Sequence, residues 1–202
     1  MTAESERAEA AIPGAPGLLQ TLEAVPRSAR WVAPALAAAF EGTDASTLEP
    51  TVRVLLLLRV AAVDRAPYWR SRLEAAAAAL GVRAEEIELV GTDEWETAPA
   101  FTDRERVAIL WGDRVARRLA RRDGAAYRAV REVFDDVELV ELTALASLGA
   151  MADRITNALR IPPEDGLGFT PAEGPLSDDA LRRWSRSMFD VVRPAWPPEM
   201  AR

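Results

Sequence analysis

The stretch LLLLRVAAVDRAPYWRSRLEAAAAALGV, residues 55–82, decides the fold. Its first half belongs to an apolar run, 48–63, that is longer than a typical strand and whose β-branched residues are diluted by Leu and Ala. The run therefore predicts a buried helix. A second helix is predicted over 67–80, because Gly81 can adopt the left-handed conformation that ends a helix. The residues DRAP join the two helices of this pair.

Helices are also predicted on both sides of this pair. Thr102 and Glu105 form a capping-box pattern, so a long helix is expected to begin at Asp103. No segment shows the alternating pattern of a strand, and the predicted fold class is therefore all-α. The other predicted helices are two segments within 18–42, a short helix ending at Gly91, the long helix 103–122, and the helices 125–134, 137–159 and 177–192.

The length of 202 residues suits one domain with additional segments at its two ends. Residues 1–15 are acidic, small and broken by Pro and Gly, and we expect a flexible leader there. The helical domain is expected over 16–165. The remainder, 166–202, is predicted as a loop and an amphipathic C-terminal helix, capped by Ser177, that packs on the same domain.

Composition excludes several functions. The chain has no Cys, no His and no Lys, and all 25 of its cationic residues are Arg. A zinc site built on thiolates or imidazoles is therefore excluded, and no Asp/Glu cluster has the spacing of a metal-binding loop. Flavin, nicotinamide and phosphate-loop motifs are missing too, so we expect neither a metal nor another cofactor.

Charge and hydropathy also limit the partners. A net charge of −7 argues against binding nucleic acid. The apolar run Val54–Leu58 is too short to span a bilayer, and no signal sequence is recognisable, so we expect no membrane partner and a cytoplasmic location. A group of arginines within 114–122 is interpreted as a solvated helix face, with an anion or a partner as the alternative.

Three blocks of this sequence, in their order and spacing, carry a family resemblance. They are 55–82, quoted above, W..APAFTDRERVAILWGD at 95–113, and VELTALASLGAMADRITNALRIPPE at 140–164. Together they resemble the carboxymuconolactone decarboxylase family and its alkylhydroperoxidase-like branch over about 45–165. The resemblance implies a multi-helix bundle with an additional C-terminal helix, assembled as a homo-oligomer, with a pocket beside 54–73.

The resemblance also implies what this chain has lost. The redox branch uses a Glu, two Cys of a CxxC pair and a His, and these positions fall on Val54, Ala66, Trp69 and Leu73. Thiol peroxidase chemistry by that mechanism is therefore impossible here. The decarboxylase branch lacks the CxxC pair but keeps the His, so that activity has no support either.

The replaced positions suggest an apolar site that holds a small molecule by shape. The predicted substrate-binding residues are Val54, Ala66, Trp69, Arg72, Leu73 and Trp111. Asp64 or Asp113 would act as acid or base, because apolar surroundings disfavour a charged carboxylate, and Tyr68 would donate to a developing oxyanion. Alternative roles are a helix cap for Asp64, core packing for Trp69 and Trp111, simple solvation for Arg72, and a buried ion pair for the neighbouring Arg59.

Two functions follow from this pattern. The first is a non-redox cyclase, isomerase or lyase that acts on a small apolar or aromatic substrate, in a specialised biosynthetic pathway. The alternative is a catalytically inactive relative that serves as a binding or assembly partner, because filling a former site with Val, Ala, Trp and Leu also consolidates a core.

Overall fold

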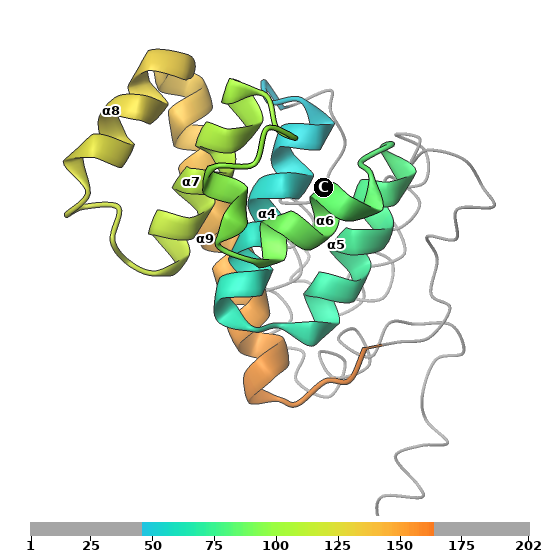
Figure 1. The fold of residues 1–202 in the computed structure, drawn as a ribbon. Coiled ribbons are helices and arrows are strands. Elements are labelled where there is room, and N and C mark those ends of the chain that lie inside the picture. Colours follow the sequence, from blue (N-terminus) through green and yellow to red (C-terminus); the bar gives the residue numbers. More distant parts are fainter. Residues whose placement is uncertain (1–45, 164–202) are drawn as a thin grey trace, which may run out of the picture.

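The computed structural model describes residues 46–163, and every regular element in this range is helical (Figure 1). The predicted all-α class is therefore confirmed. The helices predicted within 18–42 and 177–192, and the leader 1–15, lie outside the described residues. The elements are α4 (Pro50–Asp64), α5 (Pro67–Ala79), α6 (Ala84–Gly91), the 3₁₀ helix η2 (Glu94–Glu96), α7 (Asp103–Ala116), α8 (Gly124–Val133) and α9 (Asp136–Ala158).

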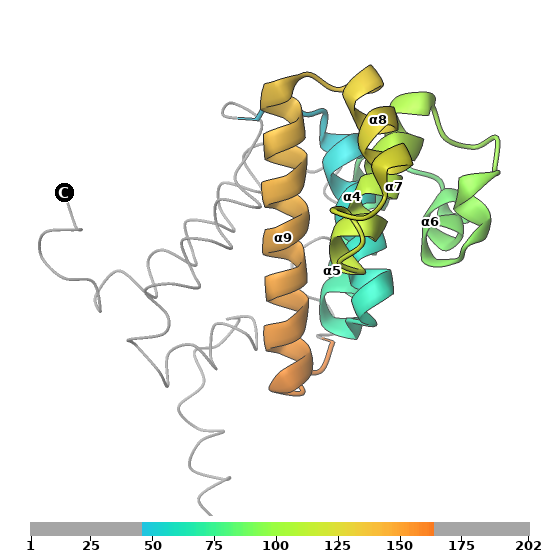
Figure 2. The same ribbon diagram turned by 90° about the vertical axis from the view of Figure 1, so that its left-hand side faces the viewer.

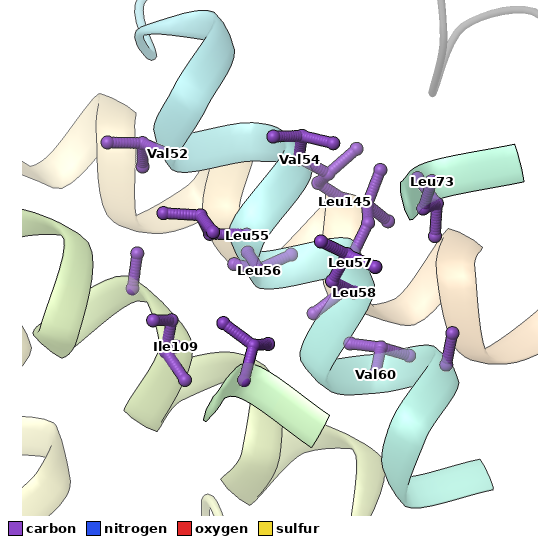
Figure 3. Close-up of a cluster of buried hydrophobic side chains, with 14 of the residues drawn as sticks. Val52, Val54, Leu55, Leu56, Leu57, Leu58, Val60, Leu73, Ile109 and Leu145 are labelled. Carbon is purple, nitrogen blue, oxygen red and sulfur yellow. The ribbon is translucent and has the colours of Figure 1, made fainter. Parts of the chain in front are cut away.

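Helix α4 is the centre of the bundle and contacts α5, α6, α7 and α9. Apart from two arginines, Arg53 and Arg59, its residues from Val52 to Val63 are apolar, which suits a helix enclosed by others. Figure 3 shows its Leu and Val side chains among Leu73 of α5, Ile109 of α7 and Leu145 of α9. The predicted buried helix over 48–63 is thus confirmed, with its start at Pro50, where a missing N–H has no cost.

The turn from α4 to α5 is made by a residue in the left-handed region. Arg65 has φ 53° and ψ 51°, and Ala66 N–H donates to the carbonyl of Ala61 at 2.9 Å while Arg65 N–H donates to Ala62. This pair of hydrogen bonds is a Schellman motif, which usually uses Gly. Pro67 then begins α5, so the chain reverses within two residues.

Helix α7 ends at Ala116, and its predicted extension to Arg122 is wrong. Arg118 has φ 61°, and Leu119 N–H donates to the carbonyl of Arg114 at 2.7 Å, so a second Schellman motif closes the helix. The sequence places no Gly or Pro at 117–122, and propensity alone cannot locate this end. The predicted start is confirmed, because Thr102 accepts a hydrogen bond from Glu105 N–H.

Glycine lets α7 approach α4 closely. A Cβ added at Gly112 would lie 2.9 Å from the backbone oxygen of Leu56, a distance that side-chain rearrangement cannot relieve. The two helices must therefore separate to admit even a methyl group.

We predict that Gly112→Ala destabilises the protein by about 1–3 kcal/mol, because it forces α7 away from α4. Urea unfolding measures the change. Gly124→Ala is the matched control, since the nearest atom to its Cβ would be 3.7 Å away on Arg128. Equal midpoints for the two variants would contradict the close-packing argument.

Candidate functional site

The four positions that correspond to the family's redox residues lie together in the core around the α4–α5 pair. Val54 belongs to α4, Ala66 precedes α5, and Trp69 and Leu73 lie on α5. Each is at most 5% exposed. The structure therefore gathers these predicted substrate-binding residues, and it buries all of them.

An aromatic group on α5 adjoins these residues. The Tyr68 ring meets the Trp69 ring edge-to-face at 5.4 Å, and the Arg72 guanidinium lies 5.0 Å from the centre of the Tyr68 ring. Both contacts are favourable for aromatic rings, whose faces are negative and whose edges are positive. Arg72 is therefore stacked on Tyr68. It is not simply a solvated side chain, which was the alternative role.

Trp111 lies in a different setting. Its indole N–H donates to Thr143 Oγ1 at 2.9 Å, and its ring packs against that of Tyr127 at 6.2 Å. These contacts join α7 to α9 and α8. Trp111 is thus packed between helices, and none of its described ring or hydrogen-bond partners belongs to α5.

Asp113 takes part in a buried ion cluster. It is 1% exposed and accepts hydrogen bonds from Arg59 Nε at 2.8 Å, from Arg117 Nε at 3.0 Å and from Arg114. Burial alone would raise the pKa of Asp113, but the hydrogen bonds from Arg117 and Arg59 and the charge of Arg59 hold it below its ordinary value. This environment favours a permanent anion and gives Asp113 little capacity to donate a proton.

Arg59 is the central cation of that cluster. It forms a buried ion pair, as the sequence analysis offered for this residue. Besides Asp113, its guanidinium donates to the carbonyls of Val90 and Thr92, at 3.1 and 2.6 Å, and to Asp93 at 2.8 Å. It also lies 5.4 Å from the centre of the Trp95 ring. Arg59 therefore ties α4 to α7 and to the segment that joins α6 and η2.

We predict that Arg59→Met destabilises the protein by about 3–5 kcal/mol, because it removes one of the three arginines that pair with buried Asp113 and leaves the carbonyls of Val90 and Thr92 without this donor. Chemical unfolding followed by circular dichroism measures this loss. Arg83→Met is the control: Arg83 makes exposed pairs with Glu85 and Glu86, which contribute little. If Arg59→Met lost no more than the control, the cluster would not hold these elements together.

Asp64 lies at the end of α4, next to the turn into α5. Its side chain is mostly buried and pairs with Arg154 of α9 at 3.4 Å, while its backbone carbonyl accepts from Asn157 Nδ2 at 3.0 Å. Asp64 makes no side-chain cap, since α5 begins without one. These contacts join Asp64 to residues of α9. Asp64 is not part of the Arg59–Asp113 cluster.

Asp153 of α9 is a functional candidate that the sequence analysis missed. It is 2% exposed, and its Oδ2 has no hydrogen-bond partner. Burial, together with the negative charge of Asp64 and against the weaker effect of Arg154, raises the pKa of Asp153 to about 8. A signal was present in the sequence: Asp153 lies four residues after Gly149 and next to Ala152, on the face that predicts core.

Asp64 and Asp153 form a carboxyl pair where the end of α4 meets α9 (Figure 1). Both carboxyls have a buried Oδ2 without a hydrogen-bond partner, but Asp64 forms an ion pair with Arg154 at 3.4 Å, whereas Asp153 is the more deeply buried of the two. The raised pKa of Asp153 keeps this carboxyl protonated at neutral pH, as a general acid requires.

We predict that Asp153→Asn stabilises the protein at pH 8 by about 2 kcal/mol or more and has little effect near pH 4. Between these values the unfolded chain has released the proton of Asp153 while the folded chain still binds it, so the stability of the native protein falls as pH rises. Asn keeps the side-chain volume and removes this penalty. The measurement is urea unfolding at a series of pH values.

The control is Asp103→Asn, at an exposed first-turn position of α7, which should show no such trend. An Asp153→Asn variant that is less stable than the parent protein at pH 8 would contradict the raised pKa.

A hollow of about 540 Å³ opens on the outer side of α9, and five residues line it: Met151, Arg154, Ile155, Ala158 and Leu159. Arg154 thus contacts Asp64 and also borders the hollow.

Among residues 46–163, no group of three or more Asp or Glu side chains is arranged to hold a metal ion. None of the helices in that range is both long and apolar enough to cross a membrane.

The arrangement of the helices is that of the AhpD-like all-helical fold. A solved structure with this fold is that of a protein of unknown function from Agrobacterium tumefaciens, which has been proposed as an antioxidant defence protein AhpD. It superposes with a TM-score of 0.63 at 21% identity, over 70% of this chain and 93% of that one. The fold expected from the family resemblance is therefore confirmed. Comparisons with protein-family models and with curated proteins find no match.

Proposed function

We propose that this protein is a non-redox enzyme that moves a proton on a small apolar or aromatic substrate, as an isomerase, cyclase or lyase does. The observation that carries the proposal is the buried carboxyl of Asp153, which has an unsatisfied oxygen and lies beside Asp64. Proteins rarely bury such a group without a function, because an unpaired polar atom destabilises the fold.

The two carboxyl groups suit complementary steps. Asp153 is protonated at neutral pH and donates its proton to a carbonyl oxygen of the substrate, while the Asp64 carboxylate removes a proton from the adjacent carbon. The product is an enol, and the reverse transfers at a different carbon complete an isomerisation without any net change in protons. No thiol, metal or oxidant takes part.

The surroundings of the pair favour an apolar substrate. Ala66 precedes α5 and Trp69 lies in the first turn of α5, and their buried side chains offer hydrocarbon and an aromatic ring. Arg154, which pairs with Asp64, is about half exposed and joins the carboxyl pair to the surface of α9. Tyr68 and Arg72, stacked on each other, are the nearby polar groups on α5.

The test is deuterium exchange at carbon. The protein is incubated in D₂O with a panel of small aryl ketones, and loss of the α-proton signals is followed by NMR. We expect catalysed exchange with at least one ketone, reduced about 100-fold or more by Asp153→Asn and by Asp64→Asn. Glu88→Gln changes an exposed carboxylate on α6 and should retain the parent rate.

Equal exchange in Asp153→Asn and Glu88→Gln would exclude Asp153 as the acid. A parent protein that exchanges none of the ketones would favour a second function, that of a catalytically inactive binding or assembly partner. This second function is supported by the burial of all four replaced positions, as a consolidated core requires: Val54, Ala66, Trp69 and Leu73.

A further inference from the structure

Helix α9 has apolar residues on two sides. One side packs on α4 and α7, whereas the other faces away from the described helices, which all lie on one side of α9 in Figure 2. The outer side carries apolar side chains three and four residues apart over the length of the helix, a spacing that places them in one line. We call them the outer stripe of α9: Val137, Val140, Ala144, Leu148, Met151, Ile155 and Leu159.

The outer stripe is only partly covered. Leu148, Met151 and Ile155 are partly buried against the core. Val137, Val140 and Leu159 are all more than half exposed, and the hollow described above interrupts the second half of the stripe. A line of this length is the pattern of a helix that packs on another helix.

We propose that residues 177–192 form an amphipathic helix that lies antiparallel on the second half of the outer stripe and fills the hollow. This segment lies outside the described residues. Its sequence, SDDALRRWSRSMFDVV, places Leu181, Trp184, Met188 and Val191 three and four residues apart, which matches the spacing of the outer stripe.

The chain path favours this occupant. Helix α9 ends at Ala158 and Ile161 is buried, so the chain leaves the bundle beside the hollow itself. Residues 164–176 can span roughly 43 Å when extended, which is enough to reverse direction, and sixteen helical residues cover about 24 Å. Such a short tether gives a high effective concentration at the hollow.

Segment 1–45 is less well placed than residues 177–192 to fill the hollow. Ser46 and Thr47, which follow it, are held by hydrogen bonds to Glu141 in the first third of α9. Glu141 lies ten residues before Met151, the lining residue nearest to it, or about 15 Å along the helix. The chain before residue 46 therefore starts beside the first half of the outer stripe, whereas residue 164 follows closely on the end of the hollow.

Charges agree with the antiparallel direction. Asp178 and Asp179 begin the segment, and in this direction they lie near Arg154, which lines the hollow, and near Arg160 beyond the end of α9. A parallel arrangement would carry these carboxylates toward Glu138 and Glu141 instead. Attraction between unlike charges therefore favours the antiparallel direction, and repulsion between like charges disfavours the parallel direction.

Thiol protection tests the proposal, because a chain without Cys gives any introduced thiol a unique signal. Met151→Cys places a thiol in the hollow of the full-length protein, and its rate of modification by a maleimide is measured. We expect Leu181→Ser with Trp184→Ser to raise that rate about tenfold or more, because the cover is lost. Neither of these two changes lies in the described bundle. Ala158→Cys provides a second probe if Met151→Cys folds poorly.

The matched control is Arg186→Ser with Asp190→Ser, which changes the opposite face of the predicted helix and leaves the net charge unaltered; it should not affect the rate. An unchanged rate in Leu181→Ser with Trp184→Ser overturns the proposal. Protection that disappears on a roughly hundredfold dilution overturns it too, since that result identifies a second copy as the occupant. These rates involve no substrate, so the result is independent of the proposed catalytic function.

Discussion

The buried pairing of Arg59 with Asp113 is the constraint on which the rest of the bundle depends. A guanidinium in the middle of an apolar helix requires partners for its N–H groups, and here α7, the end of α6 and the segment after α6 provide them. The requirement fixes α7 against α4, where Gly112 allows close contact. It also fixes the position of Trp95, over whose ring Arg59 lies. A polar interaction thus determines how the apolar surfaces meet.

Much of the fold was predictable from local signals. Capping residues at Thr102 and Asp135 define the starts of α7 and α9, because a side-chain oxygen there satisfies an otherwise free N–H. The end of α7 was not predictable, since its left-handed residue is Arg118 and an arginine carries no information about that conformation. Tertiary contacts, not propensity, decide such an end.

The candidate site was only partly predictable. Family resemblance located the four replaced positions, and the structure gathers them in the core. It divides the predicted acids, however, between two clusters: Asp113 lies with arginines, while Asp64 lies beside Asp153. Asp153 was missed although its helical spacing places it on the core face, because a charged residue is rarely buried and is therefore first assigned to solvent. Its partner is 89 residues earlier in the chain, and only the fold brings them together.

Arg154 belongs to two features at once, since it contacts Asp64 and lines the hollow on α9. Whatever fills that hollow withdraws water from the guanidinium and so alters the field at the neighbouring carboxyl pair. Thermodynamic linkage makes the effect reciprocal: if occupancy changes the proton affinity of Asp153, protonation changes the occupancy by the same factor. In that case Arg154 would couple occupancy at the surface of α9 to protonation of the interior acid.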